Sequence, residues 1–193
     1  MTDDDPDSDW QRWWDARVAA MQSVFGPTDG MVGHATIPFE IGAELGGAAD
    51  VVYFREFLPQ CVLTVTSELI GRDDQVASAL GNYELAMCQR TDDPWGPELI
   101  SRLAHYTLEA ELNPGETMDI GSAAPEGSNI SALLFLELAQ FEVLGRRAGV
   151  LLCIGLTPEE LSACRDGKVA EVESALRSKG VYPHTDHARV SVL

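Results

Sequence analysis

Apolar residues recur along the chain with two kinds of spacing, and the spacing predicts where helices and strands lie. Near the N-terminus, apolar side chains three and four positions apart predict a helix over residues 9–25, with Ser8 as its cap and Gln11 completing a capping box. The apolar stripe consists of Trp10, Trp13, Trp14, Val18, Met21 and Phe25. An aromatic stripe at helical spacing is typical of packing, so we expect it to lie against the body of the protein.

The middle of the chain changes between loop-like and strand-like composition. Glycine and proline are frequent between residues 26 and 50, which predicts loops and edge strands. The spacing becomes helical over residues 94–112, and the sequence "NPG" ends that helix. The strand-like runs cover residues 50–57, 61–69, 83–90 and 116–121.

Two later runs, residues 131–138 and 149–156, are almost wholly apolar, as is typical of central strands buried on both faces. The further elements predicted are helices over residues 158–166 and 168–178 and a final strand over residues 188–193. The pattern predicts an α+β fold in which a mixed, mostly antiparallel sheet is flanked by helices. We assign it to a single domain of residues 10–193 that follows a disordered acidic tail of residues 1–9.

The segment "LTPEELSACRDG" specifies both ends of one of these helices. Thr157 can cap the first turn, Pro158 stands where a missing N–H costs nothing, and Glu160 can reach back to the cap. Gly167 suits the C-terminal end. We interpret this segment as structural.

The net charge is the feature of the composition that bears most on function. Thirteen basic and 31 acidic residues give a net charge of −18. Residues 1–100 hold five basic and eighteen acidic side chains, a net charge of −13, and residues 101–193 hold eight and thirteen, a net charge of −5. Such a field repels nucleic acid and anionic lipid and attracts basic proteins. We therefore expect a protein partner, and neither nucleic acid nor a membrane.

The sequence also bears on the compartment and on the state of the cysteines. The start, "MTDDDPDSDW", lacks the basic and apolar regions of a secretory signal, and no apolar run approaches the roughly 20 residues that span a bilayer. We expect a cytoplasmic protein.

Four cysteines without a CxxC pair are expected to be buried free thiols. They are Cys61, Cys88, Cys153 and Cys164.

Patterns that carry chemistry are scarce. The chain has no GxGxxG, P-loop or GxSxG motif, and neither His34 nor His105 accompanies a recognisable nucleophile motif. His184 and His187 in "PHTDH" stand three apart in a non-helical stretch without a visible cluster of further ligands. We expect no catalytic residue, no cofactor and no metal.

Two pairs of adjacent aspartates remain as candidate site residues. Asp73 and Asp74 follow a glycine and an arginine, and Asp92 and Asp93 precede a proline. Such pairs can bind magnesium or act as acid and base, but in these settings they usually form turns and carry solvated charge. We expect both pairs to protrude at the ends of predicted elements, and we name them as partner-binding residues.

Five segments in order resemble one known family. They are "TSELIG", "GNYELAMCQR", "PWGPELISRLAHYTLEAE", "GETMDIG" and "LLCIGLTPEELSACRDGKVAEVESAL", and together they span roughly residues 60–180. The chain resembles the suppressor of fused family. The resemblance implies an α/β or α+β domain that acts by binding another protein and supplies no catalytic residue to transfer.

The resemblance also implies a choice between functions. Animal members hold a transcription factor in the cytoplasm, but this chain lacks their second domain, so that role is not transferred. Bacterial single-domain members are proposed to be immunity proteins that neutralise toxins. The favoured hypothesis is a bacterial immunity or antitoxin-type protein with a basic toxin partner. The alternative is a small hydrolase or ligand-binding protein that uses a cleft with His34, His105 or the aspartate pairs.

Overall fold

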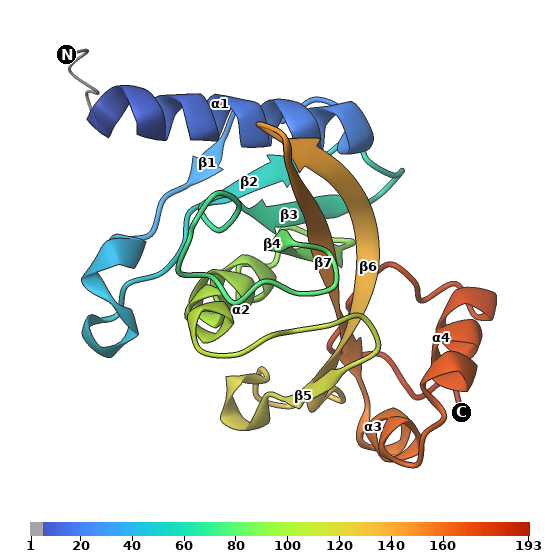
Figure 1. The fold of residues 1–193 in the computed structure, drawn as a ribbon. Helices are drawn as coiled ribbons and strands as arrows, with labels where there is room; N and C mark the ends of the chain where they lie inside the picture. The colour runs from blue at the N-terminus through green and yellow to red at the C-terminus, as the bar shows by residue number, and fades with distance from the viewer. Residues whose placement is uncertain (1–5) are drawn as a thin grey trace.

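The computed structural model describes residues 6–193 as a seven-stranded sheet with helices on both faces (Figure 1). The strands are ordered β1-β2-β3-β4-β7-β6-β5. β4 and β7 are parallel, and every other neighbouring pair is antiparallel. This confirms the predicted α+β fold with a mixed, mostly antiparallel sheet. The strands are β1 (Val32–Gly33), β2 (Val51–Phe54), β3 (Val62–Thr66), β4 (Asn82–Gln89), β5 (Thr117–Asp119), β6 (Ala132–Val143) and β7 (Arg146–Leu156).

The apolar runs form the centre of the sheet, as predicted. β6 and β7 are buried on both faces over most of their length, because alternate side chains enter two different cores. One core lies under α1 (Pro6–Phe25), α3 (Pro158–Arg165) and α4 (Val169–Ser178). The other lies under α2 (Trp95–Leu103) and the 3₁₀ segments beside it. The two edge strands have only two and three residues, which limits the backbone open to a foreign strand.

The N-terminal helix begins at Pro6, so Ser8 lies within its first turn and is not the predicted cap. The aromatic stripe packs on the sheet as predicted over most of its length: Met21 and Phe25 are buried, and Trp14 is partly buried against the same core. Trp10 is 52% exposed and stacks on Trp14 at 5.5 Å. The acidic residues Asp3, Asp4 and Asp5 of the predicted tail lie outside the described residues.

Two predicted elements differ from the structure. The helix predicted to reach residue 112 is α-helical only to Leu103 and continues as a 3₁₀ helix over Ala104–Leu108, a common way for a helix to end. The predicted C-terminal strand over residues 188–193 forms no strand. This segment instead binds the Glu160 carboxylate. The Arg189 side chain forms an ion pair with it, and the Val192 N–H donates a hydrogen bond to it at 2.9 Å.

The predicted capping box of α3 is present. The Thr157 side chain accepts a hydrogen bond from the Glu160 N–H, and the Glu160 carboxylate accepts one from the Thr157 N–H at 2.9 Å. Gly167 adopts a positive φ of 84°, a conformation that glycine adopts without strain. Among the described residues, no helix is both long and apolar enough to cross a bilayer.

Candidate partner-binding surface

The two aspartate pairs lie at opposite ends of the same strand. Asp73 and Asp74 are in the loop before β4, and Asp92 and Asp93 follow its end. β4 has eight residues, so the two pairs are separated by roughly 25 Å of strand. The structure therefore does not bring them together, and they mark two separate places on the surface.

The first pair is exposed but paired with arginines. Asp73 is 88% exposed and accepts a hydrogen bond from Arg146 at 2.9 Å. Asp74 accepts two hydrogen bonds from the Arg72 guanidinium, each 2.8 Å long. These bonds lower the pKa of Asp74 and keep it ionised at neutral pH. The expected protrusion is confirmed, but each carboxylate already has a counter-charge.

In the second pair, Asp92 is also held by an arginine. Arg55 donates to both oxygens of Asp92, at 2.7 and 2.9 Å, and its Nε donates to Asp29 at 2.7 Å. The hydrogen bonds to Asp29 and Asp92 raise the pKa of Arg55. This cluster has two carboxylates for one guanidinium, so it retains a net negative charge.

Asp93 has a structural task. It accepts a hydrogen bond from the Trp95 N–H at 3.0 Å, at the start of α2, where backbone N–H groups lack helical partners. His187 lies beside it, with Nδ1 at 3.4 Å from the Asp93 carboxylate. The same carboxylate therefore fixes the start of α2 and contacts the C-terminal segment.

A groove connects Asp92 and Asp93 with the loop that precedes β2. It consists of two adjoining hollows of about 440 and 300 Å³ that share Tyr53, Pro94 and Pro97. The acidic lining residues are Asp92, Asp93 and Glu98, and the basic ones are Arg55 and Arg102. Met31, which is 54% exposed, also lines the smaller hollow and gives it an apolar wall. The groove combines acidic and apolar side chains, which suits a basic protein segment.

His34 lines the larger hollow, as the alternative hydrolase hypothesis requires of a candidate general base. Its Nδ1 lies 2.6 Å from the Asp50 carboxylate, the contact that would orient a general base. Ser101 also lines this hollow, but its hydroxyl donates to the Ala49 carbonyl and not to His34. His105 is not among the lining residues of this hollow, and its Nε2 is 2.9 Å from the Gly47 carbonyl. Among the described side chains, His34 and Asp50 form a pair without an aligned nucleophile.

Beneath the surface, a buried carboxylate positions the loop that carries Asp73 and Asp74. Glu84 is fully buried and accepts hydrogen bonds from the Leu69 and Ile70 N–H groups at 2.9 Å and from the Thr66 hydroxyl at 2.6 Å. Arg17 of α1 donates to the Ile70 carbonyl at 2.8 Å. The start of this loop is therefore bonded both to β4 and to the N-terminal helix.

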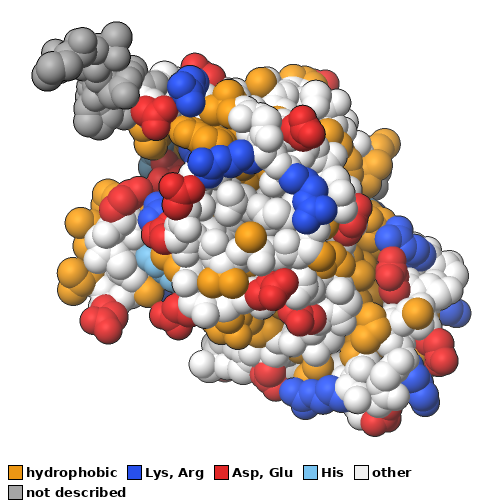
Figure 2. All heavy atoms as spheres, viewed as in Figure 1, with side chains coloured by type: hydrophobic (Ala, Val, Ile, Leu, Met, Phe, Trp, Pro, Cys, Tyr) orange, Lys and Arg blue, Asp and Glu red, His pale blue; other side chains and the backbone are white. Residues whose placement is uncertain are grey.

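Acidic side chains are spread over the face seen in Figure 2, often beside basic ones, and do not gather in a single patch there. Among the residues that the structure describes, seven arginines form ion pairs with carboxylates. The sequence has 31 acidic and 13 basic residues, so acidic side chains outnumber basic ones by 18. The surface is acidic as a whole, and the groove is one acidic part of it.

The comparison with known proteins identifies the fold. The family described as "Suppressor of fused protein (SUFU)" matches residues 50–190, which is more than half of the chain. The chain belongs to the suppressor of fused family. This confirms the resemblance seen in the five sequence segments and extends it to β2 and to the C-terminal segment.

Solved structures show the same suppressor of fused fold at low sequence identity. A protein described as a suppressor of fused homologue from Neisseria gonorrhoeae FA 1090 superimposes with a TM-score of 0.67 and 18% identity, covering 95% of this chain and 98% of that one. A chain of the Sufu–Fu complex gives a TM-score of 0.68 and 13% identity, covering 93% and 91%. No curated protein matches the sequence significantly.

One cluster in this suppressor of fused domain was missed by the sequence analysis. Cys61 and Cys88 form a disulfide, so the prediction of four free thiols is wrong for this pair. It holds for Cys153 and Cys164, which are free and buried. The pair forms because β3 and β4 are neighbours, although the two cysteines are 27 residues apart in sequence.

His184 completes the cluster. It is 8% exposed, and one of its ring nitrogens lies within 4.8 Å of both sulfur atoms. Burial lowers the pKa of His184, and the positive charge of Arg90 lowers it further. The premise that no further ligand lies near this histidine is therefore corrected. His187, by contrast, contacts Asp93.

Proposed function

We propose that this protein is a non-catalytic, protein-binding member of the suppressor of fused family, of the immunity or antitoxin type, which neutralises a basic toxin in the cytoplasm. The observation that carries the proposal is a net charge of −18 on a fold whose solved relative, Sufu, is seen in complex with another protein. A strongly acidic surface favours and accelerates the approach of a basic partner. Inhibition by binding also requires no catalytic group.

The groove at Asp92 is the proposed contact region. Its wall offers exposed Met31 next to the Asp29–Arg55–Asp92 cluster, which has two negative charges for one positive charge. A lysine or arginine of a partner can compete with Arg55 for these carboxylates, while apolar contact supplies affinity. Asp73 and Asp74 are proposed as a second, more peripheral contact, because they lie at the far end of β4.

A hydrolase remains as the second candidate, on one observation. His34 and Asp50 are 2.6 Å apart beside a hollow of about 440 Å³. If this pair acts as a general base with water as the nucleophile, His34→Ala abolishes hydrolysis of model esters or phosphodiesters by the purified protein. If the pair is structural, wild type and variant are equally inactive against such substrates.

The immunity proposal is tested first by the genes that surround this one. A neighbouring gene for a large secreted toxin, or for a secretion system, supports it. Coexpression of this protein with that toxin's C-terminal domain is then expected to restore growth of a host that the domain alone kills. Rescue by Asp92→Asn/Asp93→Asn is expected to be weaker than rescue by wild type or by the matched control Asp166→Asn/Glu171→Gln. Growth arrest despite folded wild-type protein contradicts the proposal.

A further inference from the structure

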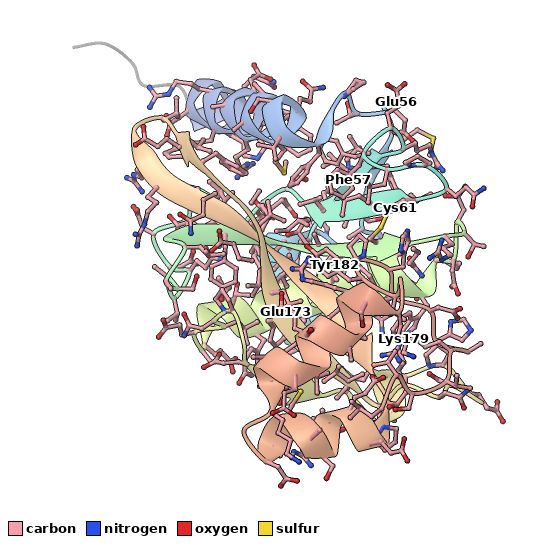
Figure 3. The ribbon with its side chains drawn as sticks, turned by 90° about the vertical axis from the view of Figure 1, so that its right-hand side faces the viewer. Glu56, Phe57, Cys61, Glu173, Lys179 and Tyr182 are labelled. Atoms are coloured by element: carbon pink, nitrogen blue, oxygen red, sulfur yellow. A yellow bond between two sulfur atoms is a disulfide. The ribbon has the colours of Figure 1, made fainter. Side chains whose placement is uncertain are left out.

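Three potential metal ligands from distant parts of the chain meet at one end of the sheet. Cys61 directly precedes β3, Cys88 lies in β4, and His184 follows α4. Their ligand atoms all lie within 4.8 Å of one another, and all three residues are buried. Figure 3 shows the Cys61 side chain next to the segment that carries Tyr182, where the end of the sheet meets the chain after α4. The three residues therefore belong to one enclosed site.

Backbone contacts hold His184 beside the two cysteines. The Thr185 N–H donates to the Cys88 carbonyl at 2.7 Å, and the His184 N–H donates to the Val181 carbonyl at 2.7 Å. His184 also forms an isolated parallel bridge with Cys88. These contacts fix the backbone of the histidine on both sides and keep the residue beside Cys88.

The His184 ring is unusual because it is more than nine-tenths buried without a hydrogen bond. Neither Nδ1 nor Nε2 has a hydrogen-bond partner among the described residues. Buried polar groups are paired in the large majority of cases, and an exception calls for a physical reason. A ring nitrogen that lies within 4.8 Å of two cysteine sulfurs has such a reason if all three atoms can bind one metal ion.

The donor set and its spacing suit zinc. Two thiolates and an imidazole are ligands that Zn²⁺ prefers, at about 2.3 Å from sulfur and about 2.0 Å from nitrogen. In a tetrahedral site the sulfurs stand about 3.8 Å apart and each lies about 3.6 Å from the nitrogen. The separations within 4.8 Å found here are therefore compatible with one ion after small side-chain movements.

We propose that Cys61, Cys88 and His184 form a zinc site in the dithiol state of this protein, and that the Cys61–Cys88 disulfide is the metal-free state of the same site. A dithiol reductant converts one state into the other: its two sulfurs form a disulfide, and its two hydrogens end on Cys61 and Cys88. Zinc then displaces the two thiol protons into solvent and binds both sulfurs and one His184 nitrogen. Three protein ligands leave the fourth position to water or an added donor.

The test compares the two redox states of the full-length wild-type protein. One sample is reduced with dithiothreitol and desalted without oxygen, and the other is left oxidised. After incubation with Zn²⁺ and dialysis, the reduced sample is expected to retain one zinc per chain and the oxidised sample none. Co²⁺ in place of zinc is expected to give the intense near-ultraviolet absorption of cobalt–thiolate bonds in the reduced sample alone. Reduced wild-type protein that retains no zinc overturns the proposal.

Variants assign the ligands. Cys61→Ser, Cys88→Ser and His184→Ala are each expected to weaken zinc binding by more than roughly 100-fold, since loss of an outer-shell partner already costs 10- to 100-fold. The matched controls are Cys164→Ser, another buried cysteine, and His187→Gln, a histidine three residues away. Both are expected to bind zinc like the wild type. Equal loss of zinc in Cys164→Ser and Cys61→Ser contradicts the assignment, and the comparison of redox states decides the matter if a variant fails to fold.

Discussion

Arg189 forms a buried ion pair with Glu160, and this pair fastens the C-terminal segment to the start of α3. Arg189 Nη1 donates to Glu160 Oε1 at 2.6 Å, and Nη2 donates to the other carboxylate oxygen. Burial alone would raise the pKa of Glu160, but the hydrogen bonds from Arg189 and from backbone N–H groups outweigh burial and lower it. Glu160 therefore serves two elements at once, the capping box of α3 and residues 189–192.

Removal of Arg189 is expected to be costly because it leaves the Glu160 charge buried. We predict that Arg189→Met lowers the free energy of unfolding by about 3–5 kcal/mol, the usual effect of breaking a buried pair on one side. The control is Arg177→Met, which breaks the more exposed pair with Glu173 and is expected to cost below about 1 kcal/mol. Urea unfolding of both variants measures the difference. Equal costs contradict the role given to Arg189.

Packing of the N-terminal helix gives a second prediction. Trp14 is partly buried against the main core and Trp10 is about half exposed, although the two rings stack on each other. Trp14→Ala is expected to lower the free energy of unfolding by roughly 3 kcal/mol and Trp10→Ala by less than about 1 kcal/mol. Denaturant unfolding of the two variants tests this. A larger loss in Trp10→Ala shows that the helix packs by another face.

Glu68 predicts a pH dependence of stability. Its pKa is raised from 4.5 to about 7: burial is the largest cause, a hydrogen bond from the Asp50 N–H opposes it, and the nearby carboxylates of Asp50, Glu40 and Glu84 add to it. Because the folded pKa exceeds the unfolded one, the stabilisation from protonated Glu68 is fully present below pH 4.5 and is lost as the pH rises through about 7.

The matched variant is Glu68→Gln, which keeps an oxygen to accept from the Asp50 N–H, at 2.7 Å in the wild type, and cannot ionise. We expect its stability relative to the wild type to increase from the acidic to the basic side of this pH window. Unfolding free energies at a series of pH values measure that difference. A difference that does not change with pH shows that the pKa of Glu68 is the same in the folded and unfolded protein, and contradicts the prediction.

Periodicity predicted most elements of the fold because burial imposes it locally. The apolar runs of β6 and β7 and the helical spacing of α1 are properties of a few consecutive residues. The prediction of a C-terminal strand was wrong because alternating apolar and polar residues also occur in an extended segment without a strand partner. Here the segment is held by hydrogen bonds to one buried carboxylate. That role depends on Glu160, which stands 29 residues before Arg189.

The contacts of a candidate site residue can be predicted from the sequence only where its partner residue is near in sequence. Asp74 pairs with Arg72, two residues away, whereas Asp73 pairs with Arg146, 73 residues away. The cluster of cysteines and histidine is the extreme case, because it depends on the register of β3 against β4, which places Leu63 opposite Cys88, and on the path of the chain after α4. Spacing along the sequence contains no information on that register.

The central claim, binding to a basic protein partner guided by charge, makes a direct kinetic prediction. Charges separated by more than about 8 Å are screened at physiological ionic strength, so steering by the acidic surface must weaken as salt is added. Neutralising an acidic surface residue is expected to slow association and to change dissociation less. Each Asp→Asn change removes one negative charge and leaves the charge of the neighbouring arginine, Arg55 or Arg146, in place.

The most direct measurement is stopped-flow association, at several salt concentrations, with a basic toxin domain that this protein neutralises in the coexpression test. The variants are Asp73→Asn/Asp74→Asn and Asp92→Asn/Asp93→Asn, with Asp166→Asn/Glu171→Gln as the control. We predict that salt lowers the association rate much more than it raises the dissociation rate, and that Asp92→Asn/Asp93→Asn has the largest effect of the three. An association rate that does not respond to salt, with both aspartate-pair variants binding at full strength, contradicts the claim.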